Sequence, residues 1–463
     1  MADQKKGKKK GKADQLTALW HRLPSEIIPE ILLWLPVKSL CRFRCVSKSW
    51  LLLILDPKFV KNHFNKAIEH EHVFYQRRKL LFTDEKINSL YFFDLDEYLN
   101  RYNDNPFLNG IGNRNNNVGD YDGDLIVTRL KLPSYLPCFR QFQNEKWSLV
   151  SFCCGLVLFK LGVEYYVANP ATRKYKILPD LIPWPEAPPF MPYNGFGFDH
   201  STDDFKVITS KCSKDGIEFM VYALKSSSWR KIQRRFPYYA GPPRPLAYRS
   251  GPGQRRFPYS TGRARAGILL NGRLHWLMRR LEDDSQVIVS LCLADEEVWE
   301  IPLPIDFDVG ALHTLELGLF FNDSLCIAHV FVTGMTLDPT SAITLHDEFW
   351  VMKEYKVAES WTKRILSSGL EGYLLPSSYQ RENHALFWVG ECLGQRVYNI
   401  KDLCCQRLSI PGYPTVTGAG FYVESLVSLD TGRGFRFSHN SISNSIWTTC
   451  LSLWNLKCSL CSF

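Results

Sequence analysis

The stretch between residues 23 and 64 constrains this chain more than any other, because it carries apolar side chains at helical spacing within very little chain. Ile27, Ile31 and Leu35 recur at four-residue steps, which places them on one face of a helix. Prolines crowd the start of this helix, where a missing backbone N–H costs least. Pro36 ends it, because the residue before a proline is pushed out of the helical region.

Short helices with their own capping residues follow the first one. Ser39 is a candidate N-cap for a second helix, and Ser47 for a third that contains Trp50. Asp56 can cap a further short helix with Pro57 at its first position. So short a segment cannot bury all the apolar surface that it carries. Either a partner protein covers this surface or the residues form the core of a small bundle, and spacing alone leaves both readings open.

These residues resemble the F-box family. The matching pattern is Leu-Pro at residues 23–24, Leu-Pro-Val-Lys-Ser-Leu at 35–40 and Arg-Phe-Arg-Cys-Val-Ser-Lys-Ser-Trp at 42–50, within a region from 20 to 64. The resemblance implies docking onto a Skp-type adaptor and, through it, onto a cullin–RING ubiquitin ligase.

Carried over position by position, the resemblance implies an adaptor-binding surface made of large apolar anchors with few charges. Its residues are Leu23, Pro24, Ile28, Ile31, Leu32, Leu35, Pro36, Val37, Leu40, Val46, Ser47 and Trp50. Some of these side chains must also hold the helices together, and the sequence does not separate the two roles. Trp34 lies where the family often has a polar or basic residue, and it is either a rim contact or an exposed apolar side chain.

The chain has 463 residues, enough for one small and one large domain, and its 45% hydrophobic and 22% charged residues are ordinary for a globular protein. The net charge of +9 is unevenly placed, since six lysines fall within residues 1–12. Residues 1–19 are predicted to be a disordered tail, which is either a nuclear-localisation patch or a solubilising segment. No apolar run follows them, so we expect no secretory signal and a location in the nucleus, the cytoplasm or both.

Cysteines and catalytic motifs give no sign of a reaction centre. The fourteen cysteines lie mostly in apolar runs, which indicates free thiols in a reducing compartment. The Cys-x-x-Cys pair at 458–461 has no second pair at zinc-ligand spacing. The sequence has no Walker loop, Gly-x-Ser-x-Gly elbow or His-Glu-x-x-His pattern. We therefore predict no catalytic, cofactor-binding or metal-binding residues, and a protein that is not an enzyme.

From residue 147 the chain consists of short apolar runs of strand length separated by turns. Asn271-Gly272 between two such runs predicts a two-residue type I′ hairpin turn, and His275 beyond it is expected to be structural. Similar hairpin units recur at irregular steps of roughly 40 to 60 residues, within the range of propeller blades. A two-sheet sandwich also fits, because the repeats are too divergent to count blades.

This β region also resembles the F-box-associated region found downstream of plant F-boxes. The matching pieces include Asn-Pro-Ala-Thr-Arg at 169–173, Gly-Phe-Gly-Phe-Asp at 195–199 and Asn-Gly-Arg-Leu-His-Trp at 271–276. The resemblance implies a kelch-like β fold that receives a substrate. The expected fold class is α+β and multidomain: a small N-terminal three-helix F-box followed by an all-β, β-propeller-like domain.

The expected domain organisation has a helical and a β part joined by irregular chain. Its parts are the tail 1–19, the F-box 20–64, a linker 65–146, the β domain 147–430 and a C-terminal tail 431–463. The linker has candidate strands at 80–82 and 90–93 and an Asn-rich loop at 100–124. The C-terminal tail is apolar but contains too many polar residues for a membrane span, so it is either a last strand or an abnormal chain end.

A basic insert at residues 234–265 interrupts the β domain. Arg-Arg-Phe-Pro-Tyr at 234–238 recurs at 255–259, with prolines, glycines and further arginines nearby. Arginine interleaved with aromatics can bind RNA, or it can present a basic surface to an acidic substrate. We favour a duplicated flexible loop between two strands, because this composition cannot form a packed core.

The combined prediction is a non-catalytic substrate-recognition subunit of a Skp–cullin–F-box ubiquitin ligase. The F-box would bind the adaptor, and the β domain would bind an unknown target protein for ubiquitination and degradation. No cofactor, membrane or nucleic-acid partner is expected for this reading. The alternative is an interaction protein outside any ligase, which would use the arginine-rich insert to bind RNA.

Overall fold

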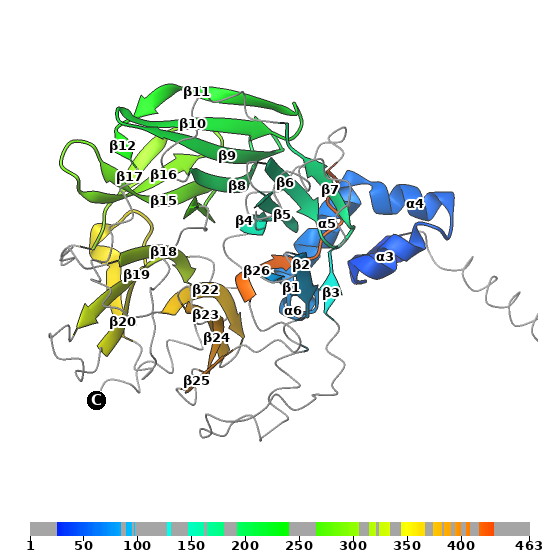
Figure 1. The fold of residues 1–463 in the computed structure, drawn as a ribbon. Helices are drawn as coiled ribbons and strands as arrows, with labels where there is room; N and C mark the ends of the chain where they lie inside the picture. Colours follow the sequence, from blue (N-terminus) through cyan, green and yellow to red (C-terminus); the bar gives the residue numbers. More distant parts are fainter. Residues whose placement is uncertain are drawn as a thin grey trace, which may run out of the picture.

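The structure is a computed structural model of the 463-residue chain. It describes residues 26–84, 89–94, 97, 127–130, 147–161, 164–179, 192–239, 265–304, 314–320, 324–333, 344–365, 374–381, 384–389, 394–399, 404–407 and 416–429. Five α-helices come first: α2 (Ile27–Leu33), α3 (Val37–Phe43), α4 (Lys48–Leu55), α5 (Pro57–Glu69) and α6 (Glu71–Arg77). Figure 1 shows them on one side of a large β domain.

Two of the predicted helix caps are confirmed. At the start of α4, Ser47 Oγ accepts a hydrogen bond from the backbone N–H of Trp50 at 3.2 Å. At the start of α5, Asp56 Oδ1 accepts from the N–H groups of Lys58 (2.8 Å) and Phe59 (3.1 Å). Both caps satisfy donors that have no partner within the helix, so they define where each helix begins.

The helix α3 begins earlier than predicted. The prediction of Ser39 as its N-cap is wrong, because the helix already starts at Val37. Pro36 occupies the capping position in extended conformation, and its carbonyl accepts the N–H groups of Ser39 (3.0 Å) and Leu40 (3.2 Å). The fixed φ of proline thus starts this helix without a side-chain acceptor.

Six sheets follow in the part of the chain that the structure describes, and their strand pairs are antiparallel except for β13 with β8. The first contains β26 (Val416–Val423), β1 (Arg78–Asp84), β2 (Ser89–Phe93) and β3 (Thr128–Arg129). The second contains β4 (Trp147–Cys153), β5 (Leu156–Leu161), β6 (Glu164–Asn169) and β7 (Lys174–Ile177). The third contains β8 (Tyr193–Asp199), β9 (Asp204–Ser213), β10 (Gly216–Ala223), β11 (Ser228–Phe236) and β13 (Arg265–Ala266).

The remaining three sheets complete the set (Figure 1). The fourth contains β12 (Tyr238–Tyr239), β14 (Ile268–Leu270), β15 (Arg273–Arg280), β16 (Gln286–Cys292) and β17 (Val298–Ile301). The fifth contains β18 (Thr314–Phe320), β19 (Ser324–Thr333), β20 (Thr344–Met352) and β21 (Trp361–Ile365). The sixth contains β22 (Leu374–Arg381), β23 (His384–Val389), β24 (Gly394–Asn399) and β25 (Cys404–Arg407).

The sheets close into a ring. Contacts run from β26 to β4, β4 to β8, β8 to β15, β15 to β18, β18 to β22 and β24 back to β26. The late strand β26 pairs with the early strand β1, so that Leu80 faces Phe421 across the ladder. A ring of small sheets is a β-propeller, which leaves only short edges exposed. The propeller prediction is therefore confirmed, and the sandwich alternative is wrong.

The β domain begins before residue 147. Strands β1 and β2 lie within residues 65–146, the segment assigned as an irregular linker, and they include the candidate strands at 80–82 and 90–93. They belong to the sheet that closes the ring, because their partner β26 comes from the other end of the described chain. The Asn-rich loop at 100–124 lies outside the described residues.

The Asn271-Gly272 turn forms as predicted. Both residues have positive φ, 52° and 70°, which a type I′ turn requires. The turn brings Leu270 opposite Arg273 and so joins β14 to β15. Glycine is suited to the second position because it adopts positive φ without steric cost.

The arginine-rich insert starts later than residue 234. Its first Arg-Arg-Phe-Pro-Tyr copy lies in strands β11 and β12, and Phe236 and Tyr238 are buried in the core of the third and fourth sheets. Arg235 of this copy pairs with Glu218 on the neighbouring strand at 2.7 Å. The assignment of this copy to a flexible loop is therefore wrong, and the second copy lies outside the described residues.

Candidate functional site

A buried arginine organises the helical domain. Arg77, the last residue of α6, is 1% exposed, and its Nη2 donates to the carbonyls of Leu33 (2.7 Å) and Leu35 (3.1 Å) at the end of α2. Its Nη1 donates to the carbonyl of His63 on α5 at 2.6 Å. The last carbonyls of a helix have no partner inside the helix, so Arg77 satisfies acceptors that would otherwise be buried without a donor.

His63 lies at the same junction and has no exposed surface. Its Nε2 is 2.9 Å from the carbonyl oxygen of Leu35, and because a carbonyl only accepts, we assign the ring proton to Nε2. Its Nδ1 faces Arg77 Nη1 at 3.3 Å and acts as an acceptor. Burial, followed by the charge of Arg77, lowers the pKa of His63 to about 3, so the ring is neutral at physiological pH.

The segment after β26 joins the helices to the propeller. The N–H of Glu424 donates to the carbonyl of Arg77 at 2.8 Å. The side-chain amide of Asn169, which is fully buried, donates to the carbonyls of Ser425 (3.0 Å) and Val427 (2.8 Å). Its Oδ1 accepts two N–H groups of its own turn. One side chain thus ties a turn of the second sheet to this joining segment.

A continuous hydrophobic core crosses the junction. Its helical members include Leu32, Leu33, Val37, Leu40, Ile54, Phe59, Val60 and Phe64. Leu426, Val427 and Leu429 come from the joining segment, and Leu156, Leu158, Val167, Phe196 and Val207 are among its members from the second and third sheets. Figure 1 shows α5 against the propeller and α3 and α4 projecting away from it. The shared core holds the helices in one orientation on the propeller.

The predicted adaptor-binding residues divide into two roles. Three belong to the shared core and are at most 2% exposed: Leu32, Val37 and Leu40. Three are half-buried against it: Ile28, Leu35 and Trp50. Four are exposed: Ile31, Pro36, Val46 and Ser47. Two lie outside the described residues: Leu23 and Pro24.

The helices expose a concentration of large apolar side chains. We call them the exposed apolar set: Ile27, Ile31, Trp34, Val46, Leu51, Leu52 and Leu55. Leu52 is 66% exposed and Val46 is 61% exposed. Single exposed apolar residues are ordinary, but seven within residues 27–55 indicate an interaction surface.

The residue pattern identified only part of this set. Ile31 and Val46 are among the predicted adaptor-binding residues, whereas Leu51, Leu52 and Leu55 of α4 are not. Residues 50–55 of this helix are all apolar, so spacing cannot tell which side packs inward. Only Ile54 among them is buried, because α3 and α5 cover one side of the helix and leave the other open.

Trp34 is partly covered by its neighbours. It is 38% exposed, and its ring lies 4.8 Å from the ring of His70 and 5.6 Å from that of His72, measured between centroids. The ammonium of Lys66 is 4.4 Å from the centroid of the indole. These contacts fix the orientation of the indole, so Trp34 is a candidate rim contact beside the other exposed residues.

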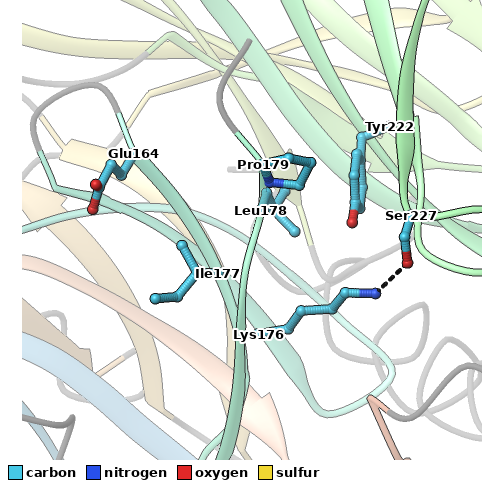
Figure 2. A pocket seen from close by; sticks show the side chains of 7 residues that line it. All are labelled: Glu164, Lys176, Ile177, Leu178, Pro179, Tyr222 and Ser227. Carbon is cyan, nitrogen blue, oxygen red and sulfur yellow. Dashed lines mark hydrogen bonds between the residues drawn. The ribbon is translucent and has the colours of Figure 1, made fainter. Parts of the chain in front are cut away.

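The propeller carries a cavity of about 490 Å³ between the second and third sheets (Figure 2). It is lined by Glu164, Lys176, Ile177, Leu178, Pro179, Tyr222 and Ser227. Hydrogen bonds join its two walls, since Lys176 Nζ donates to Ser227 Oγ at 2.8 Å and Trp229 Nε1 donates to the Pro179 carbonyl at 2.8 Å. The volume lies in the range of ligand sites, about 300–1,000 Å³.

The other buried histidine is structural, as predicted. His275 has no exposed surface, and its Nδ1 lies 3.0 Å from the carbonyl oxygen of Ile268. Its Nε2 lies 2.7 Å from the Tyr355 hydroxyl and 3.2 Å from that of Ser290. Burial lowers the pKa of His275 to about 4. The ring therefore links the fourth and fifth sheets as a neutral hydrogen-bonding group.

Within the described ranges, no group of three or more His, Cys, Asp or Glu residues is placed to hold a metal ion. Seven cysteines whose side chains are described are free thiols, as predicted: Cys41, Cys45, Cys153, Cys154, Cys212, Cys292 and Cys326. The Cys-x-x-Cys pair at 458–461 and the C-terminal tail lie outside them. No helix in the described part of the chain is both long and apolar enough to cross a membrane.

Comparison with known proteins accounts for both parts of the chain. Residues 20–62 match the F-box domain, and residues 133–371 match the F-box associated beta propeller domain. The chain therefore belongs to the F-box proteins that carry an F-box associated β-propeller. This confirms both family resemblances seen in the sequence.

The curated relatives are plant F-box proteins. F-box/kelch-repeat protein At3g23880 of Arabidopsis thaliana is 26% identical over 426 residues, which covers 88% of this chain and 96% of that protein. F-box protein CPR1 of the same plant is 25% identical over 442 residues, 88% of each chain. Among solved structures, a nidogen/laminin complex is 10% identical over 75% of this chain and 99% of that chain. The TM-score of this comparison is 0.37.

Proposed function

We propose that this protein is a non-catalytic substrate-recognition subunit of a Skp–cullin–F-box ubiquitin ligase. The F-box binds a Skp-type adaptor and, through it, a cullin–RING ligase, and the propeller binds a protein target. The exposed apolar set is the observation that carries the proposal. It lies on the F-box helices, and the core that buries Leu33 and Leu40 leaves it exposed.

The shared core supports the same mechanism. A receptor promotes ubiquitin transfer by holding the target near the conjugating enzyme. This raises the effective concentration of the target's lysines at that enzyme. An F-box that is packed on the propeller through residues 424–429 holds its adaptor-binding surface at a fixed position relative to the target-binding domain. Such an arrangement limits the loss of effective concentration that a flexible linker would cause.

Adaptor capture by the purified full-length protein tests this proposal. The double variant Ile31→Asp/Val46→Asp places two charges in the exposed apolar set without touching the core, so it should weaken adaptor binding by about tenfold or more. Leu281→Asp, at an apolar residue of the propeller that is 39% exposed, is the matched control and should bind normally. If the wild-type protein fails to capture the adaptor, or the double variant binds as well as wild type, the proposal is wrong.

An RNA-binding role through the arginine-rich insert is the alternative. The first copy of the repeated motif is less suited to it than the sequence suggests, because Phe236 and Tyr238 are buried and Arg235 is paired with Glu218. Deletion of residues 240–264 distinguishes the two functions. Under the ligase proposal, the deletion should leave adaptor capture unchanged. Under the RNA-binding alternative, the deletion should abolish RNA binding.

We also propose a nuclear or cytoplasmic location. The lysine-rich segment at residues 5–12 supports it, because a short run of lysines is typical of nuclear-localisation signals. A fluorescent fusion of the whole chain tests it when compared with a variant in which the six lysines are replaced by glutamine. Exclusion of the variant from the nucleus would identify these lysines as the signal, whereas an unchanged distribution would identify them as a solubilising segment.

A further inference from the structure

The cavity between the second and third sheets has the features of a recognition site (Figure 2). Its floor is the ring of Tyr222, which has no exposed surface. The hydroxyl of this tyrosine is buried and makes no well-formed hydrogen bond. Burial raises the pKa of Tyr222, and the Ser227 hydroxyl lies close enough to oppose that shift, so the tyrosine hydroxyl is a neutral donor at physiological pH. A buried hydroxyl without a partner is costly, and an unsatisfied donor that lines a cavity indicates a ligand acceptor.

A cation and a second hydroxyl lie beside the tyrosine. In Figure 2 the ammonium of Lys176 and the hydroxyls of Ser227 and Tyr222 point toward one another. Lys176 Nζ is 2.8 Å from Ser227 Oγ, 3.2 Å from the carbonyl oxygen of Leu224 and 5.9 Å from the centroid of the Tyr222 ring. The Ser227 hydroxyl itself donates to the carbonyl of Leu224 at 3.2 Å, so its role is to hold Lys176. The Lys176 ammonium and the Tyr222 hydroxyl form a suitable donor pair for a carboxylate, because an anion accepts stronger hydrogen bonds than a neutral oxygen.

The hairpin that carries Lys176 is basic, and on the opposite wall the buried carboxylate of Asp204 further raises the pKa of Tyr222. The hairpin from residue 164 to residue 179 contains three cations, Arg173, Lys174 and Lys176, and one acid, Glu164. In Figure 2 Glu164 lies on the far side of Ile177 from the side chains of Lys176, Ser227 and Tyr222. The hairpin therefore has an excess of two positive charges, which attracts an anionic partner and repels a cationic one.

The shape of the site favours an extended polypeptide. Strand β7 forms one wall and is the outermost strand of its sheet. Outermost strands are where extended segments of partner proteins add to a sheet. Beside the donors, Ile177 is 40% exposed and Pro179 is also exposed, so the same strand offers an apolar contact to a neighbouring side chain.

We propose that this cavity binds an extended segment of the target protein in which an acidic side chain stands next to a large apolar one. The acidic group accepts hydrogen bonds from Lys176 and Tyr222, and the apolar side chain packs on Ile177 and Pro179. This inference rests on the proposed function, because it identifies how the propeller of a substrate receptor recognises its target.

Selection of peptides on the full-length protein tests the inference. Random short peptides displayed on phage are selected on the immobilised protein, and the most enriched sequence is synthesised with a fluorescent label for anisotropy measurements. Enriched peptides should carry Asp or Glu next to Leu, Ile or Phe. No enrichment, or enriched peptides that lack the acidic residue, would overturn the proposal.

Variants locate the binding at this cavity. Lys176→Glu should lower the affinity for the selected peptide by about tenfold or more, and Tyr222→Phe should lower it by about threefold. Tyr222→Phe should not lower the thermal midpoint, because the hydroxyl it removes makes no well-formed hydrogen bond in the folded chain. Lys353→Glu, the same charge change at an exposed residue just after β20, is the control and should bind normally. Unchanged peptide affinity in Lys176→Glu would place recognition elsewhere.

Adaptor capture separates this inference from the proposed function. Lys176→Glu should still capture the adaptor, because Lys176 lies outside the exposed apolar set. Loss of peptide binding with adaptor capture retained supports the cavity as the target site. If adaptor capture fails while the peptide binds as described, the cavity is a recognition site but the ligase role is wrong.

Discussion

The guanidinium of Arg77 holds both the backbone and the ring of His63. Its Nη1 is 2.6 Å from the carbonyl oxygen of His63 and 3.3 Å from Nδ1 of the same residue. Burial lowers the pKa of Arg77 to about 10, and the carboxyl group of Glu424 opposes that shift, so the arginine remains charged at physiological pH. A buried charge of this kind makes the junction between F-box and propeller depend on each of its hydrogen-bond partners.

Arg77→Ala is expected to lower the free energy of unfolding by about 3 kcal/mol, because it removes the hydrogen bonds to three buried carbonyls, of which that of Leu35 keeps His63 Nε2 as a donor. Denaturant unfolding followed by circular dichroism measures the change. Arg42→Ala, at an exposed arginine of α3, is the control and should change stability by less than about 0.5 kcal/mol. Equal stability of the two variants would show that Arg77 does not hold the junction together.

Stability should fall when the solution is acidified below about pH 6.5, the ordinary pKa of histidine in an unfolded chain. In the folded protein burial lowers the pKa of His63 to about 3, so between these values the unfolded chain binds a proton that the folded chain does not. This contribution to stability is fully present above pH 6.5 and is lost toward pH 3. At pH 5 the expected loss is about 2 kcal/mol, to which His275, with a pKa of about 4, adds a similar amount.

Urea unfolding at pH 7.5 and at pH 5.0 measures this dependence. His63→Gln should be less stable than wild type at pH 7.5, because it disturbs the contacts to Arg77 and Leu35. It should also lose less stability on acidification, because the proton-binding group is gone. The same loss in both proteins would contradict the assignment of His63 as a buried neutral group.

Asn169→Asp should loosen the segment that joins β26 to the F-box. The substitution keeps the shape of the side chain but turns its donating nitrogen into a carboxylate oxygen, which then faces the carbonyls of Ser425 and Val427. We expect a loss of about 2–3 kcal/mol and faster hydrogen exchange in the F-box helices. Asn271→Asp, in the type I′ turn where aspartate is well tolerated, is the control. Unchanged exchange in Asn169→Asp would show that the joining segment does not stabilise the F-box.

Gly155→Ala should be more destabilising than Gly272→Ala. Both glycines have positive φ, 80° and 70°, so alanine costs about 1 kcal/mol or slightly more at either position. A Cβ at residue 155 would also lie 2.2 Å from Ser425 Oγ, whereas residue 272 has nothing within 4 Å. The difference between their thermal midpoints measures how tightly the turn at residue 155 packs on the joining segment. Equal midpoints would show that Ser425 can move aside.

The local sequence pattern was sufficient to predict features that depend on neighbouring residues. The caps at Ser47 and Asp56 and the turn at Asn271-Gly272 were all readable, because each depends on the chemistry of a few adjacent positions. The error at Ser39 has the same origin, since a proline start competes with a side-chain cap within three residues. Arg77 and His63 gave no such signal, because their partners lie on other helices.

The sequence by itself determined the two parts of the protein: the helical spacing and F-box pattern near the start, and the short strands and turns that make blades. Only the tertiary structure decided which apolar residues of the F-box are core and which remain exposed, and that β1 and β2 complete the ring with β26. It also brought Lys176 and Tyr222 to one cavity. The physical reason is that burial and strand pairing depend on residues far apart in the chain, whereas spacing and capping depend on near neighbours.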